Sequence, residues 1–126
     1  MATIKSYTDL SQSKVLAKIL PLESSDMYWD LLSNDKYAKI NNIGHCLCRT
    51  CIYAWSLAAL LEQFPYELCD DDGNSAYLKI NKEDDLYQLV YTDPYGDFKN
   101  IETDRYEHFV DACYELILKL HELKLL

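Results

Sequence analysis

The chain has 126 residues, of which 49% are hydrophobic and 26% are charged, a composition typical of folded domains and not of disordered chains. Twenty-one acidic against twelve basic residues give a formal net charge of −9, with no basic patch that would bind phosphate backbones or anionic lipid. We therefore expect one compact domain over 1–126 that binds neither nucleic acid directly nor membranes.

The cysteines indicate a cellular compartment. There are five of them, an odd number, and the sequence opens without an apolar leader segment. Neither feature is typical of a secreted, disulfide-rich protein. A cytoplasmic location is the expectation.

A first helix is predicted over 8–20, where apolar residues recur on one face. Thr8 or Asp9 can cap its N-terminus, and Pro21 ends it. The pattern weakens over 22–44, for which we expect a short helical turn or a strand.

A second helix is predicted before Pro65. Ser56 is a suitable N-cap residue, although the helix could also begin earlier, near Cys48. The apolar stripe that defines it comprises Leu57, Leu60, Leu61 and Phe64.

The hydrophobic period then changes to two, which is typical of strands. The predicted strands cover 66–69, 76–82 and 86–92, with a turn at 93–97. Because the links between them are short and polar, we expect an antiparallel meander of three or four strands with one face on the core and the other in water.

The last helix has the strongest pattern, with an apolar stripe that runs from Tyr106 to Leu123. Thr103 or Asp104 is the expected cap, with Glu107 completing a capping box behind Asp104. The predicted fold is therefore α+β, a small antiparallel meander packed against N-terminal, central and long C-terminal helices.

A cluster of cysteines and a histidine has the residue types and spacing that suggest a zinc site. His45, Cys46, Cys48 and Cys51 have spacings at which thiolates and imidazole can converge on Zn²⁺. Structural zinc sites usually add a second pair of ligands from another segment, and no second paired motif follows. Ordinary packing of buried cysteine is the competing interpretation, and no cofactor is predicted.

The same cluster could instead provide a thiol nucleophile. This alternative needs His108 or His121 to lie beside one of the cysteines in the folded chain. A metal-dependent or thiol enzyme centred on 45–51 therefore remains one hypothesis.

The acidic run Asp70, Asp71 and Asp72, followed by Gly73, invites a calcium interpretation. The register of a helix-loop-helix calcium site fails, because its first and twelfth positions fall on apolar and basic residues. A solvated hairpin loop fits these residue types better.

Eleven tyrosines supply large amphipathic side chains of the kind that dominate protein interfaces. We expect Tyr77, Lys79, Tyr87 and Tyr91 on an exposed sheet face and, with Asp70, Asp71 and Asp72, in a protein-binding surface. The partner could be an unidentified protein or a second copy of the chain, in a homo-oligomer joined by this face or by an unpaired strand edge.

Three stretches, 20–27, 54–61 and 111–126, together resemble a group of small proteins of bacterial phage and mobile elements. The likeness extends over nearly the whole chain and rests on a Trp-Ser-Leu helix at Trp55, a tyrosine-bearing hairpin and a C-terminal amphipathic helix. It implies a fold but no activity. The leading hypothesis is a non-enzymatic, acidic accessory factor of a phage or mobile element that binds a protein, with acidity that could imitate nucleic acid in a basic cleft.

Overall fold

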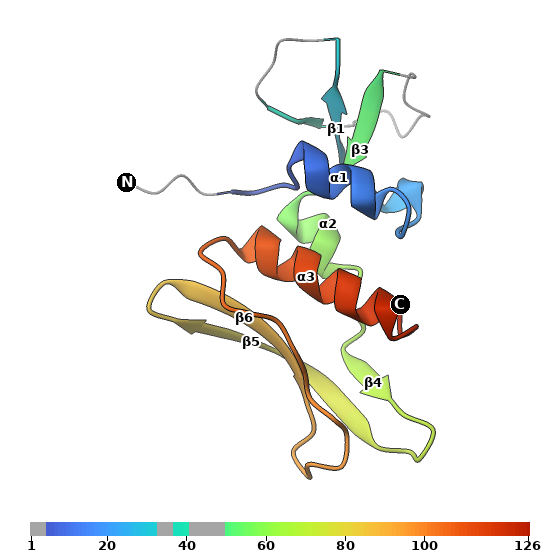
Figure 1. The fold of residues 1–126 in the computed structure, drawn as a ribbon, viewed down its shortest axis with the longest axis vertical. Coiled ribbons are helices and arrows are strands. Elements are labelled where there is room, and N and C mark those ends of the chain that lie inside the picture. Colours follow the sequence, from blue (N-terminus) through green and yellow to red (C-terminus); the bar gives the residue numbers. More distant parts are fainter. Residues whose placement is uncertain (1–4, 33–36, 41–49) are drawn as a thin grey trace.

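The computed structural model describes residues 5–32, 37–40 and 50–126 and confirms the predicted α+β class. A small antiparallel sheet lies at one end, the helices lie in the middle, and a larger antiparallel sheet lies beyond them (Figure 1). The helical elements are α1 (Leu10–Leu16), the 3-10 turn η1 (Leu22–Ser24), α2 (Leu57–Leu61) and α3 (Phe109–Glu122). The strands are β1 (Met27–Asp30), β2 (Lys39–Ile40), β3 (Cys51–Ala54), β4 (Glu67–Cys69), β5 (Ser75–Glu83), β6 (Leu86–Thr92) and β7 (Ile101–Glu102).

Helix α1 has Asp9 as its N-cap, one of the two residues predicted for this role, and Asp9 forms a capping box with Gln12. The Asp9 carboxylate accepts a hydrogen bond from the backbone N–H of Gln12 at 2.8 Å, and the Gln12 side chain accepts one from the Asp9 N–H at 3.1 Å. Thr8 does not cap the helix. Its buried hydroxyl accepts from the N–H of Trp55 at 3.1 Å and so ties the N-terminal segment to the end of β3.

The small sheet has the order β2-β1-β3 and includes the strand that was one expectation for 22–44. Residues 27–30 pair along their whole length with 51–54. The alternative that a helix begins near Cys48 is wrong from residue 51 onward, because β3 fills that position as a partner of β1.

Helix α2 begins where the sequence predicted. The Ser56 hydroxyl accepts from the N–H of Ala59 at 3.2 Å and satisfies one of the backbone donors that every helix leaves unpaired at its start. The helix ends before Pro65. It is short, and its buried residues face α3.

The larger sheet has the order β4-β5-β6-β7, with every neighbouring pair antiparallel, so the predicted meander is confirmed. Strand β6 has the predicted bounds. Asp84 and Asp85 form the turn between β5 and β6 with φ values of 52° and 62°, the left-handed region that a two-residue hairpin turn requires. The two-residue strand β7 was not predicted.

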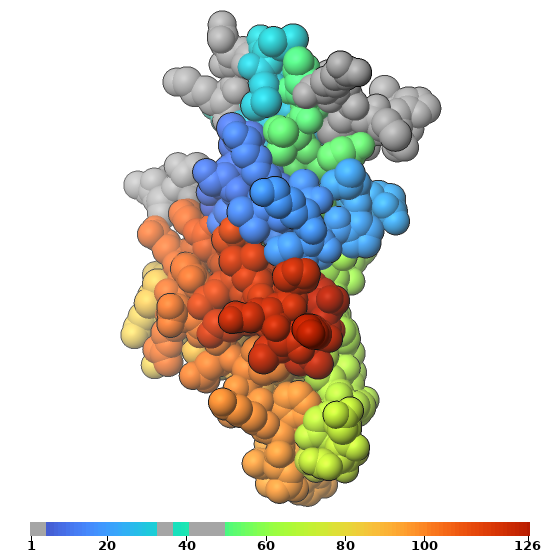
Figure 2. Space-filling model, turned by 45° about the vertical axis from the view of Figure 1, so that its right-hand side comes forward, coloured from blue at the N-terminus to red at the C-terminus, as the bar shows by residue number. Residues whose placement is uncertain are grey.

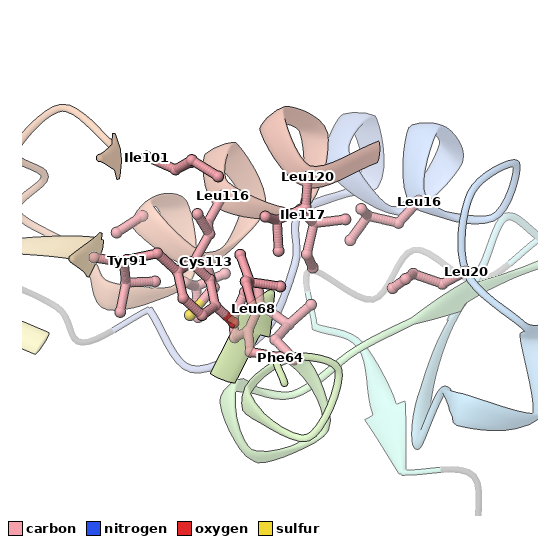
Figure 3. Close-up of a cluster of buried hydrophobic side chains, with 14 of the residues drawn as sticks. Leu16, Leu20, Phe64, Leu68, Tyr91, Ile101, Cys113, Leu116, Ile117 and Leu120 are labelled. Atoms are coloured by element: carbon pink, nitrogen blue, oxygen red, sulfur yellow. The ribbon is translucent and has the colours of Figure 1, made fainter. Parts of the chain in front are cut away.

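The core lies between the larger sheet and the helices (Figure 3). Helix α3 contributes one buried side, and β6 contributes Leu89 and Tyr91. The completely buried residues of α3 are Val110, Ala112, Cys113, Leu116, Ile117 and Leu120. The predicted apolar stripe therefore packs on the sheet.

The expected cap of α3 is wrong. The helix begins at Phe109 after His108, which makes no side-chain capping bond. The reason is that the preceding residues are extended along β6: Thr103 bonds to Leu89, and Tyr106 pairs with Tyr87. The polar groups of Thr103 and the backbone of Tyr106 are bonded to β6, so this segment pairs with the sheet instead of starting the helix.

Candidate functional site

The acidic run at 70–72 lies in the loop between β4 and β5, and Asp70 organises that loop. Its carboxylate accepts from the backbone N–H of Asp72 at 2.9 Å, from the N–H of Asn74 at 2.8 Å and from the Asn74 amide at 3.0 Å. Partial burial raises the pKa of Asp70, but the bonds from Asn74 and Asp72 outweigh it and leave the pKa below its usual value. Asp70 is a structural residue of the turn.

A second loop, between β6 and β7, is built in the same way around Asp93. Its carboxylate accepts from the backbone N–H groups of Tyr95 at 2.8 Å, Asp97 at 3.0 Å and Phe98 at 2.8 Å. Asp93 and Phe98 are buried, so the loop is fixed to the core. Residue types alone suggested only a turn here.

The two loops lie side by side at one end of the molecule, because the start of β5 pairs with the end of β6 (Figure 2). Three carboxylates there, those of Asp71, Asp72 and Asp97, are exposed and have no bonded partner within the described part of the chain. Tyr95, 88% exposed, lies in the same loop. We call this surface the acidic end and define it by these four residues.

A groove of about 610 Å³ runs beside the acidic end, between the loop before β7 and the C-terminal end of α3. Its size is that of a ligand or peptide site. Its lining residues are apolar (Phe98, Ile101, Leu123 and Leu125), acidic (Asp70, Glu102 and Glu122), basic (Lys99 and Lys119) and the amide residue Asn100. The groove therefore has an apolar base, and its charged lining residues include more carboxylates than basic groups.

One basic side chain of the groove is already occupied. The Lys119 ammonium donates to the backbone oxygen of Glu102 at 2.6 Å and lies 3.8 Å from the Glu115 carboxylate. A bound partner would therefore meet Lys99 as the one unengaged cation in the described lining, against the unengaged carboxylates of Glu102 and Glu122.

The residues expected on one exposed sheet face are divided between both faces. Tyr77 and Lys79 lie on the outer face, with the Tyr77 ring 5.6 Å from that of Tyr66. Tyr87 and Tyr91 lie opposite Lys82 and Leu78, on the face that packs against α3.

The expected exposure of Tyr91 is wrong. The residue is fully buried, its hydroxyl donates to the backbone oxygen of Pro65 at 2.5 Å, and burial raises its pKa to about 12. Tyr87 is half-buried against Phe109, with ring centroids 5.0 Å apart. Both tyrosines stabilise the fold, and the interface role of Tyr77 and Lys79 stays a prediction.

The proposed zinc or thiol cluster lies mostly outside the described residues. His45, Cys46 and Cys48 are not described, and Cys51 is half-buried in β3. Across 5–32, 37–40 and 50–126, no group of three or more potential ligands could hold a metal ion. Both hypotheses about the cluster stay predictions.

The described part of the chain also contains a pairing of serine with carboxylate. The Ser56 hydroxyl donates to Asp26, and the same carboxylate accepts from the Ser56 N–H at 2.8 Å. Because the hydroxyl oxygen also accepts from Ala59 to cap α2, this pair has a structural function. It joins the start of β1 to the start of α2.

The buried thiol of α3 is not activated as a nucleophile. Cys113 is fully buried, and burial raises its pKa to about 12, so the nucleophilic thiolate is not formed at neutral pH. Neither Cys113 nor Tyr91 has the lowered pKa that an activated nucleophile needs.

Comparison with protein families, with curated proteins and with solved structures finds no match for this chain. Among the described residues, no helix is both long enough and apolar enough to span a membrane.

Proposed function

We propose that the chain is a non-enzymatic interaction domain that binds a basic protein segment at its acidic end. The observation that supports this most is the pair of rigid loops built on Asp70 and Asp93. Each uses one aspartate internally and leaves neighbouring carboxylates pointing into solvent without partners. Because the backbone of both loops is held in place, less conformational freedom is lost when a cation binds these carboxylates.

The adjoining groove supports a partner that is basic and partly apolar. Phe98 and Ile101 are buried at its base, whereas Leu123 at its rim is 54% exposed. An aliphatic or aromatic anchor in the groove would bury this surface, and Lys or Arg residues on either side would meet the acidic end. The net charge of −9 would also speed the approach of such a partner.

Two sequence features supply the cellular context: the odd number of cysteines favours the cytoplasm, and the resemblance favours a phage or mobile element. On that basis the domain acts in the cytoplasm as an accessory factor of such an element. A basic cleft that normally holds nucleic acid is one partner surface of suitable charge.

A charge-reversal comparison tests the proposal. One variant combines Asp71→Lys, Asp72→Lys and Asp97→Lys, and its matched control combines Glu23→Lys, Glu62→Lys and Glu107→Lys. The control residues are exposed and lack bonded side-chain partners within the described chain. Either set changes the formal net charge from −9 to −3, so the variants differ only in where the charge is lost.

Crosslinking capture from host cells would compare these variants with the wild-type chain. We expect one or more basic proteins captured by the wild type and by the control variant, but not by the variant changed at the acidic end. Equal capture by all three forms, or no specific capture by the wild type, would contradict the proposal.

A further inference from the structure

Strand β5 is much longer than the strand that covers its outer edge. It has nine residues, whereas β4 has three and pairs only with 75–77. One further bond, from the Leu78 N–H to the Tyr66 oxygen at 3.1 Å, ends this contact. Figure 1 shows the β5–β6 hairpin extending away from β4, and no described strand lies on this edge over 79–83.

The backbone of Ile80 points to this open edge. In antiparallel pairs, opposite residues either bond to each other or both face away. Leu89, the partner of Ile80, bonds on its far side to Thr103: its oxygen accepts at 3.0 Å and its N–H donates to the Thr103 hydroxyl at 3.1 Å. Ile80 therefore directs its own N–H and C=O away from β6.

The same reasoning applies to Lys82. Its partner Tyr87 exchanges backbone bonds with Tyr106 at 2.7 and 2.8 Å, on the side away from β5. The N–H and C=O groups of Lys82 therefore also face the open edge. The edge presents a donor and an acceptor at every second residue, which is the pattern that another strand would satisfy.

We propose that a second copy of the chain binds this edge, β5 against β5, across a two-fold axis at Asn81. In this register Ile80 lies opposite Lys82 of the second copy. Each such pair exchanges two backbone hydrogen bonds, and the two-fold axis generates the pair twice. The two larger sheets become one continuous sheet.

Sterics and charge select this register. Sliding the strands toward β4 places Lys82 of the second copy opposite Leu78, where Tyr66 already lies. Sliding them the other way places Lys82 opposite Lys82, with like charges in contact. The register centred on Asn81 pairs the open backbone groups of Ile80 and Lys82 without opposing like charges, and only the turn residue Asp84 of the second copy, where its strand has ended, lies opposite Leu78.

Side chains at this register are complementary. Lys79 lies opposite Glu83 of the second copy, and the two-fold axis forms this pair of opposite charges twice. Both residues are exposed, and the Glu83 side chain is 67% exposed even with Arg105 3.4 Å away. Ile80, 49% exposed in the single chain, becomes covered on the other face.

The helices leave room for the second copy. Helix α3 packs on β6, which lies one strand further from the proposed axis than β5. The two β6 strands would be three strand spacings apart, about 14 Å. Because a helix with its side chains is about 10–12 Å wide, the two α3 helices would lie side by side without collision.

Sedimentation velocity from about 1 µM to about 1 mM tests the proposal, since short interfaces associate in this range. We expect the wild type to pass from monomer to dimer. Lys79→Glu and Glu83→Lys should each raise the dissociation constant roughly tenfold or more, because each places like charges opposite each other twice. An equimolar mixture of the two variants should restore dimers, since all its charge pairs are again opposite.

Two controls separate the edge from the general fold. Ile80→Pro removes an N–H that the single chain does not use, so the variant should remain folded by circular dichroism but monomeric. Arg105→Gln removes the ion pair of Glu83 without touching the edge and should leave the dimer intact. A wild type that stays monomeric throughout, or a mixture of charge variants that does not associate, would overturn the proposal.

Discussion

The carboxylate of Asp93 accepts a hydrogen bond from the buried backbone N–H of Phe98 at 2.8 Å, and this bond fixes an exposed loop to the core. Asp93→Ala leaves that N–H unpaired, together with those of Tyr95 and Asp97. We expect a loss of about 2–3 kcal/mol in the free energy of unfolding. Urea denaturation measures it, and Asp93→Asn, which keeps one acceptor oxygen, should lose less.

A buried hydroxyl contact joins the N-terminal segment to β3. Thr8→Val keeps the shape of the side chain but removes the acceptor of the Trp55 N–H and the partner of the Ser13 hydroxyl, 2.7 Å away. The free energy of unfolding should fall by about 1–3 kcal/mol. The same substitution at half-buried Thr92 is the control and should change stability by less than about 0.5 kcal/mol. Equal effects would mean that the Thr8 contact adds nothing.

The hairpin turn between β5 and β6 can be improved. Asp84 and Asp85 both have positive φ, a backbone conformation that residues other than glycine and asparagine adopt at a cost. The double substitution Asp84→Asn with Asp85→Gly should raise the free energy of unfolding by about 1 kcal/mol. Thermal denaturation measures the change, and an unchanged or lower midpoint would argue against the turn geometry.

Acid should weaken the loop at Asp70. Its pKa in the folded chain is lowered from the ordinary value of 3.8. The stability that the ionised Asp70 adds to the folded chain is therefore fully present above about pH 4, and it is lost as the pH falls through the pKa of the folded state. Asp70→Asn should therefore show a smaller loss of stability between pH 5 and pH 2 than the wild type, measured by urea midpoints. Parallel curves for the two proteins would contradict this assignment.

Thiol reactivity should distinguish two described cysteines. Cys69 is exposed in β4, whereas Cys113 is buried with a pKa of about 12. Alkylation of the folded protein, followed by peptide mass analysis, should modify Cys69 within minutes and Cys113 only after denaturant is added. Rapid modification of Cys113 in the native protein would show that α3 opens readily.

Local signals in the sequence predicted the elements whose stability is local. The caps at Asp9 and Ser56, the bounds of β6 and the apolar stripe of α3 follow from neighbouring residues alone. Strand β3 and the extended segment 101–106 do not, because their hydrogen bonds come from partners distant in the chain. The late start of α3 is a consequence of that second segment.

The sequence pattern of β6 itself argues against placing Tyr87 and Tyr91 on the exposed face. Alternation places both on the side of Leu89, which is fully buried. Lys82 shares that inner face, and its ammonium lies 5.3 Å from the centre of the Tyr87 ring. The acidic end was only partly predictable: residue types gave the run at 70–72, but its alignment with Asp97 and Tyr95 depends on the register of β5 and β6.

The most direct test of the central claim is the affinity of a captured basic partner, measured by calorimetry for the wild type and both triple-lysine variants. We predict that reversal at Asp71, Asp72 and Asp97 weakens binding by roughly a hundredfold, because several charge contacts are lost together. The control variant, with the same formal net charge, should bind within about threefold of the wild type. Equal weakening in both variants would show that net charge alone governs binding, and would contradict a site at the acidic end.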